Sequence, residues 1–172
     1  MGLLSSLLGG NKKQRLLEWQ NIVMAQHSNR LVMTEQQLQQ ASIQQAQNDL
    51  RIMNDCRNLV STTVKPDVFV GRLHLMIEKA EHLQQLEKYI SFSGASPTAA
   101  LNEIRQNYQE AIKQFLVRYF SDTFDKAEAM KTEKGKQNKY IKFYESLQEY
   151  YCYMDESNKE YVETKYRAYV KG

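Results

Sequence analysis

The sequence predicts an all-α protein, an antiparallel bundle of four to five helices with a long first helix. Apolar residues recur every three or four positions along most of the chain, which is the spacing of one helix face. Only 7 of the 172 residues are Gly and 2 are Pro, so turns are few and elements are long. The period-two alternation that marks a strand does not occur. Together these observations favour helices joined by short turns.

The first helix is expected to cover residues 11–62, after a flexible N-terminus at residues 1–10. No Pro or Gly interrupts residues 11–62, and a continuous helix there would be on the order of 70 Å long. Few helices are that long, so a break within residues 27–30 is the alternative. Over its second half the predicted apolar stripe consists of Leu38, Ala41, Ile52, Cys56 and Leu59.

A helical hairpin is predicted over residues 66–130. Pro66 followed by Asp67 is typical of a helix start, because Pro lacks the N–H that would be left unpaired there and Asp complements the positive helix end. The second helix should run to residue 90. Ser96 and Pro97 then give the N-cap and the first residue of a third helix over 97–130.

The C-terminal helices are predicted over residues 139–170. Residues 131–138 are polar and basic and contain Gly135, which indicates a loop or a bend. A fourth helix should cover 139–154, and Ser157 with Glu160 forms a capping-box pattern for a fifth. Residues 11–172 are thus expected to form a single helical domain.

Two segments carry a resemblance to a known group of proteins. They are residues 50–56 (LRIMNDC) with 66–69 (PDVF), and residues 131–136 (KTEKGK) with the apolar positions after them. In these the chain resembles small uncharacterised helical proteins of Gram-positive bacteria and their mobile elements, over about residues 45–170. The resemblance implies a bacterial cytosolic helical module and implies no activity.

Composition indicates in which compartment the protein is found and which kinds of partner it binds. The 23 basic and 20 acidic residues give a net charge of +3, too weak an excess to predict a polyanion-binding protein. Cys56 and Cys152 form no CxxC pair, so we expect reduced thiols and a cytoplasmic location. No apolar run is long enough for a transmembrane segment, and the basic residues follow the apolar N-terminal stretch instead of preceding it as in a secretory signal.

No catalytic site and no cofactor is predicted. The one arrangement that suggests a metal is His74, Glu78 and His82, which recur every four residues on one face of the second helix. Three groups on one helix are too few to close a site, so a solvated polar face is the preferred interpretation and we expect no metal. Cys56 lies on the apolar stripe, where a buried structural thiol is expected. We therefore expect a non-enzymatic protein.

Two surfaces are candidates for binding. The apolar start of the first helix would overhang its shorter neighbours, which predicts association with a protein partner or a second copy, as a homo-oligomer, through Leu16, Trp19, Val23 and Leu31. The alternative is a nucleic-acid accessory protein that binds through basic residues interleaved with tyrosines in the C-terminal third. Packing of these tyrosines inside the fold is favoured over nucleic-acid binding. The residues of this alternative site are Lys134, Lys136, Lys139, Tyr140 and Tyr144.

Overall fold

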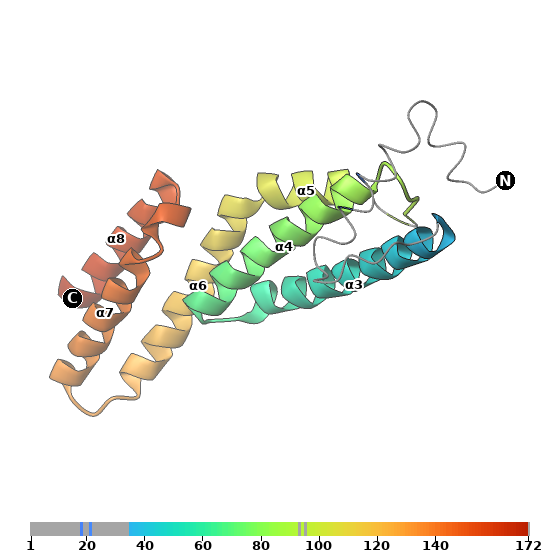
Figure 1. The fold of residues 1–172 in the computed structure, drawn as a ribbon. Helices are drawn as coiled ribbons and strands as arrows, with labels where there is room; N and C mark the ends of the chain where they lie inside the picture. The colour runs from blue at the N-terminus through green and yellow to red at the C-terminus, as the bar shows by residue number, and fades with distance from the viewer. Residues whose placement is uncertain (1–17, 19–20, 22–34, 93, 95, 172) are drawn as a thin grey trace. The chain divides into compact units, whose positions relative to one another are not determined.

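The computed structural model describes Glu18, Asn21 and residues 35–92, 94 and 96–171, and it confirms the all-α fold. In this part of the chain every regular element is helical (Figure 1). The expected flexible residues 1–10 and the question of continuity at 27–30 lie outside the described residues. The elements are α3 (Glu35–Thr62), α4 (Pro66–Leu86), α5 (Pro97–Gln106), α6 (Tyr108–Glu128), α7 (Glu133–Gln148), the 3-10 turn η1 (Tyr151–Tyr153) and α8 (Glu156–Lys171).

The described chain divides into two compact units. The first contains residues 35–56 with 74–105, and the second contains residues 57–73 with 106–171. Each unit has its own buried core. The expectation of a single domain over residues 11–172 stays a prediction.

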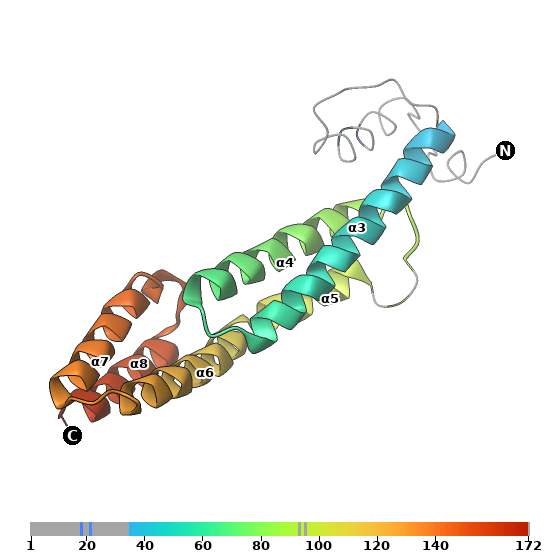
Figure 2. The same ribbon diagram turned by 90° about the horizontal axis from the view of Figure 1, so that it is seen from below.

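The first unit packs α3, the second half of α4 and α5 around a mainly aliphatic core (Figure 2). On α4 the buried side chains recur every three or four positions, whereas on α3 they follow the predicted stripe only in part. Ser42 and Ala46 are buried, whereas Ala41 and Ile52 are half-buried. The expected α3 stripe was therefore right at Leu38 and Cys56. It was wrong at Ala41, Ile52 and the exposed Leu59, because other side chains occupy the buried face between Leu38 and Cys56. The buried face of α3 comprises Leu38, Ser42, Ala46, Asp49, Met53 and Cys56.

The second unit packs α6, α7 and α8 against one another, together with the first turns of α4. Its core is aromatic. The rings of Phe69 and Phe115 stack with centroids 4.4 Å apart, and Phe120 meets Phe143 edge-on at 4.7 Å. Aromatic pairs in these arrangements are each worth about 1 kcal/mol beyond the area that they bury. The remaining fully buried side chains of this unit are Leu116, Ala127, Leu147 and Val162.

Several boundaries differ from expectation. The helix expected over 97–130 is interrupted at Asn107, whose φ of −94° and ψ of 7° separate α5 from α6. Asn competes for backbone hydrogen bonds and so favours such positions. Conversely, α7 begins at Glu133, inside the expected loop, because Thr132 is extended and caps it by accepting the Gly135 N–H at 3.2 Å.

The last helix is also capped differently from the capping box that was expected. Asp155 accepts the Asn158 backbone N–H at 2.8 Å, so α8 begins at Glu156 and Ser157 already lies within it. Between α4 and α5 the turn uses Gly94 at a φ of +109°, which residues with a Cβ rarely adopt. Among the helices that the structure describes, none has the length and apolar character needed to cross a membrane.

Candidate functional site

The four residues predicted to drive association, Leu16, Trp19, Val23 and Leu31, lie outside the described residues. The described part of the predicted first helix, α3, has an outer face that stays exposed to solvent. Ile43 and Leu50 on α3 remain 43% and 45% exposed, and they are one heptad apart. A shallow groove follows this outer face along Gln36, Gln39, Gln40, Ile43, Gln44 and Gln47.

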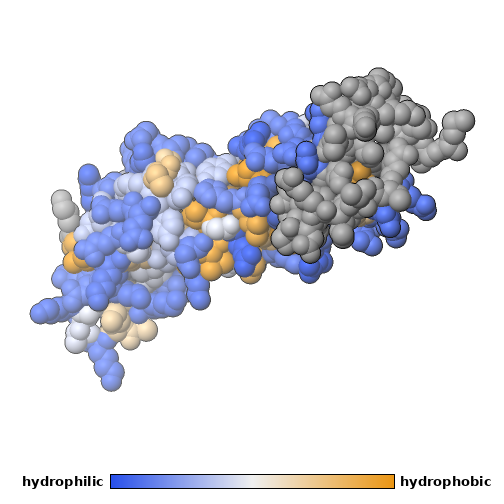
Figure 3. Space-filling model, in the orientation of Figure 1, coloured by the Kyte–Doolittle hydropathy of each residue, from blue (hydrophilic) through white to orange (hydrophobic). Residues whose placement is uncertain are grey.

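The N-terminal part of this outer face of α3 is uncharged. From Gln36 to Asn48 the helix carries no acidic or basic residue, and most side chains are Gln. A helix normally places its charges on the solvent side, so a polar but uncharged face with two exposed apolar side chains is unusual. On the face drawn in Figure 3 the described surface is mostly hydrophilic, and apolar residues gather mainly near its middle.

The three candidate metal ligands do not converge. His74 is exposed, and the Glu78 carboxylate lies 2.9 Å from Lys79 Nζ. His82 turns toward α3, where its Nδ1 is hydrogen-bonded to Asp49. Among the described residues no group of three His, Cys, Asp or Glu side chains is arranged to hold a metal ion. The expected solvated face was wrong at His82, whose side chain is only 12% exposed.

Asp49 is the centre of a buried polar cluster that the sequence interpretation missed. Its side chain is fully buried, and its two oxygens are hydrogen-bonded to His82 and Gln45 and lie near Lys79. Gln45 Nε2 donates to Asp49 Oδ1 at 3.1 Å, and Lys79 Nζ lies 4.0 Å from the same oxygen. A buried carboxylate is tolerated only with such partners. A signal was present, because Asp49 lies at the helical spacing of Ala46 and Met53 on the face that α3 buries.

The two tyrosines of the alternative nucleic-acid site are used inside the fold. Tyr140 is buried and stacks on Tyr169 with centroids 4.8 Å apart, and Tyr144 stacks on Tyr166 at 4.0 Å. The Tyr144 hydroxyl also donates to Glu163. These contacts leave fewer ring faces for stacked bases.

The three lysines of that site lie in different surroundings. Lys136 pairs with Glu128 at 3.1 Å and with Glu133 at 3.6 Å, and the hydrogen bond to Glu128 raises the pKa of Lys136. Lys134 is exposed in the first turn of α7. Lys139 lines a cavity, so the three lysines do not form one continuous surface row with the tyrosines.

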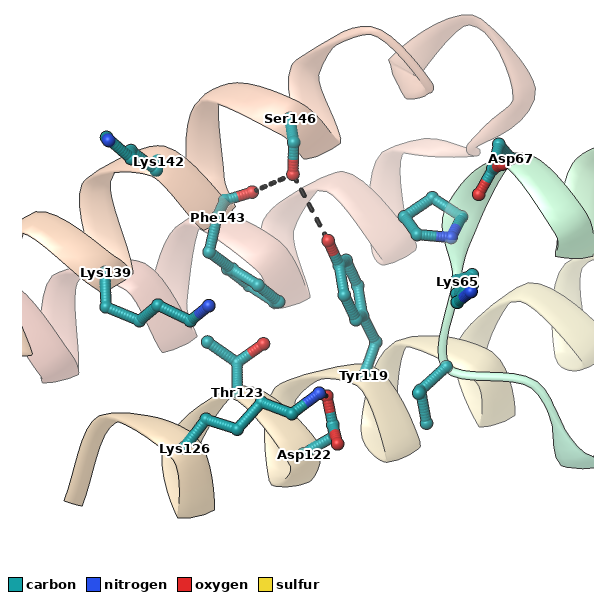
Figure 4. A pocket seen from close by; sticks show the side chains of 12 residues that line it. Lys65, Asp67, Tyr119, Asp122, Thr123, Lys126, Lys139, Lys142, Phe143 and Ser146 are labelled. Atoms are coloured by element: carbon teal, nitrogen blue, oxygen red, sulfur yellow. Dashed lines mark hydrogen bonds and ion pairs between the residues drawn. The ribbon is translucent and has the colours of Figure 1, made fainter. Parts of the chain in front are cut away.

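The cavity beside Lys139 holds about 360 Å³ and lies wholly within the second unit (Figure 4). Its walls are the turn before α4 and one face each of α6 and α7. Four lysines and two aspartates line it together with hydroxyl and aromatic groups. Sequence analysis could not find it, because its residues are brought together from three separate segments only by the fold. The lining residues are Val64, Lys65, Pro66, Asp67, Tyr119, Asp122, Thr123, Lys126, Lys139, Lys142, Phe143 and Ser146.

A Glu163-centred hydrogen-bond cluster fixes α7, η1 and α8. The hydroxyls of Tyr144 and Tyr151 both donate to Glu163 Oε1, from Tyr151 at 3.0 Å. Burial, and then the hydrogen bond to Glu163, raise the pKa of Tyr151. This cluster gives Tyr144 and Tyr151 of the Tyr-rich C-terminal sequence a packing role.

The chain was compared with family models, curated proteins and solved structures, and none of them matches it.

Proposed function

We propose that the protein is a non-enzymatic, cytoplasmic helical interaction module that binds a protein partner, foremost a second copy of itself, through its first helix. The observation that carries the proposal is the outer face of α3, where Ile43 and Leu50 stay exposed one heptad apart. Such spacing is that of a helix-to-helix seam. Apolar side chains repeated at that spacing gain from burial against another helix.

The chemistry of this face favours self-association over a charged partner. Two copies of the segment 36–48 meet without like-charge repulsion, because the segment carries no charge. Gln side chains are both donors and acceptors, so they pair with their own kind across a symmetric interface. The proposal also assigns Leu16, Trp19, Val23 and Leu31 to the association.

Light scattering on the full chain tests the proposal. We expect a mass above the 20.2 kDa of one chain that persists at high salt, because apolar burial is not screened. The double variant I43E/L50E should shift the mass toward the monomer. Val117 is 48% exposed on α6, so V117E is the matched control and should leave the mass unchanged.

Two results would contradict the proposal. One is a monomer at every concentration for the wild-type chain, and the other is an oligomer that I43E/L50E and V117E weaken equally.

Removing residues 1–30 should also lower the mass while the helical circular dichroism of the remaining chain persists.

The nucleic-acid alternative remains the weaker proposal. Exposed Lys134 and cavity-lining Lys139 supply charge, but the rings of Tyr140 and Tyr144 are stacked within the protein. Its signature is binding of a single-stranded oligonucleotide that falls steeply with salt and is lost in K134E/K136E/K139E. A flat salt response would remove it.

A further inference from the structure

The cavity of the second unit has a charge distribution that the proposed interaction through α3 does not use. Its four lysines outnumber its two aspartates by two positive charges. One of the aspartates is already neutralised, because Lys126 Nζ lies 2.7 Å from Asp122 Oδ2. Lys65, Lys139 and Lys142 form no ion pair with any described residue. The cavity therefore has unneutralised positive charge and only Asp67 to oppose it.

Figure 4 shows how these charges are directed. The ammonium of Lys139 points toward the centre of the cavity above Thr123, whereas Lys142 points away from it. The start of α4, at Lys65 and Pro66, forms the opposite wall. The first turn of a helix adds a positive partial charge, which Asp67 offsets in part. Positive charge at the cavity thus comes from Lys139 on one side and from Lys65 at the start of α4 on the other.

The floor between these walls is suited to an organic body. Phe143 and Tyr119 supply apolar ring surface, and Val64 and Pro66 add aliphatic surface. The Tyr119 hydroxyl lies 3.3 Å from the Ser146 hydroxyl, which leaves two adjacent polar groups along an otherwise apolar wall. Small-molecule sites combine such a mainly apolar lining with a few polar groups, in volumes of about 300–1,000 Å³.

We propose that this cavity binds a small organic phosphate of about the size of a nucleoside monophosphate. The phosphate group is held by Lys139 and by the turn before α4. The organic part of the ligand packs against Phe143 and Tyr119. A phosphate is favoured over a carboxylate because it has three acceptor oxygens and up to two negative charges for two lysines, Lys65 and Lys139, on opposite walls. A flat surface that tracks an extended strand is not favoured, because the charges line a bounded hollow and not a row.

Titration calorimetry on the full chain tests this proposal with adenosine and uridine monophosphate as probes. We expect saturable one-to-one binding of a monophosphate, and weaker binding of adenosine, which lacks the phosphate, and of inorganic phosphate, which lacks the body. K139Q should weaken binding about tenfold, as expected for loss of one charge-assisted contact. K139R keeps the charge and should bind within about threefold of wild type.

Lys134 provides the matched control, since it is an exposed lysine on the same helix but outside the cavity. K134Q should leave the affinity unchanged, and circular dichroism should be identical for all three variants. The proposal is overturned if neither monophosphate binds at millimolar concentration, or if K134Q weakens binding as much as K139Q. Tighter binding of an eight-residue oligothymidylate that depends equally on Lys134 and Lys139 would also overturn it, in favour of an open nucleic-acid surface. None of these outcomes depends on whether α3 mediates self-association.

Discussion

Asp49 on α3 and His82 on α4 are hydrogen-bonded through Oδ2 and Nδ1 in the buried part of the first unit. The other carboxylate oxygen accepts from Gln45, and Lys79 lies 4.0 Å away. The cluster thereby joins two helices by polar contacts within a mainly apolar interface. Because each partner is directional, it fixes the register of α3 against α4 more narrowly than apolar packing does.

Removing the Asp49 carboxylate should therefore destabilise the fold strongly. In D49A, His82 loses its hydrogen-bond partner and Lys79 loses a nearby negative charge, and we expect a loss of about 2–4 kcal/mol in the free energy of unfolding. Urea denaturation followed by circular dichroism measures it. The control is D125A, an exposed aspartate on α6, which should change stability by less than about 0.5 kcal/mol. Equal stabilities of the two variants would show that the cluster does not matter.

A second cluster fixes the start of α6 to the start of α8 within the second unit. Gln109 Nε2 donates to the Tyr153 carbonyl at 3.1 Å, and Gln109 Oε1 accepts from Asn158 Nδ2 at 3.0 Å. Asn158 also donates to the Gln109 carbonyl at 3.1 Å and is only 3% exposed. We expect Q109A and N158A each to cost about 1–3 kcal/mol.

Because the two side chains share a hydrogen bond, their effects should not add. The double variant Q109A/N158A should lose at least about 0.5 kcal/mol less than the two single losses combined. The measurement is a double-mutant cycle by urea denaturation, and N138A, at an exposed position of α7, serves as the control. Strict additivity would contradict the coupling.

The fold class was predictable because periodicity and scarce Gly and Pro act along the whole chain. The buried face of α4 was predictable for the same reason, since Phe69, Leu73 and Met76 are large and regularly spaced. On α3 the same reasoning failed, because Ser42 and Asp49 occupy core positions that a search for apolar residues passes over. Whether a Ser or an Asp is buried depends on what the neighbouring helix offers.

At the start of α7 two residues favoured different local structures. Gly135 indicated a loop, but Thr132 caps a helix that contains it, and a Gly in the first turn costs little. The cavity beside Lys139 depends on residues from three segments, and no spacing within one helix predicts it. The Tyr-rich C-terminus was correctly interpreted as a packing region for Tyr140 and Tyr144, although which rings pair was not predictable.

Six tyrosines of the second unit should ionise at a higher pH than an ordinary tyrosine. Burial raises the pKa of six of the eleven tyrosines, namely Tyr108, Tyr140, Tyr150, Tyr151, Tyr161 and Tyr169. Their folded-state pKa values exceed the unfolded value of about 10, so the stabilisation is fully present below pH 10 and is lost as the pH rises above it.

Absorbance at 295 nm with parallel circular dichroism checks this. We expect these six tyrosines to ionise only above pH 10 and together with loss of the helical signal. Y151F removes one of these hydroxyls and should reduce the amplitude of this high-pH phase. A single phase near pH 10 with unchanged helix content would contradict the expectation.

Two glycines inside helices should respond in opposite directions to replacement by Ala. Gly71 lies exposed in α4, and a Cβ there meets nothing within 4 Å. G71A should stabilise the protein by about 0.5–1 kcal/mol, because Ala loses less backbone entropy in a helix. At Gly135 a Cβ would lie 2.9 Å from Thr132 Oγ1, the oxygen that caps α7. G135A should therefore lower the free energy of unfolding by up to about 1 kcal/mol. Displacing the Thr132 cap costs more than the higher helix propensity of Ala contributes.

The cause can be isolated by removing the oxygen. In a T132A background the cap is already lost and nothing holds a hydroxyl against the new methyl group, so adding G135A should be stabilising, as G71A is. Thermal and urea unfolding of the four combinations at positions 132 and 135, with G71A alongside, give the sign at each step. If G135A is as stabilising as G71A in the wild-type background, the Thr132 side chain moves aside at no cost, and the first turn of α7 does not depend on its cap.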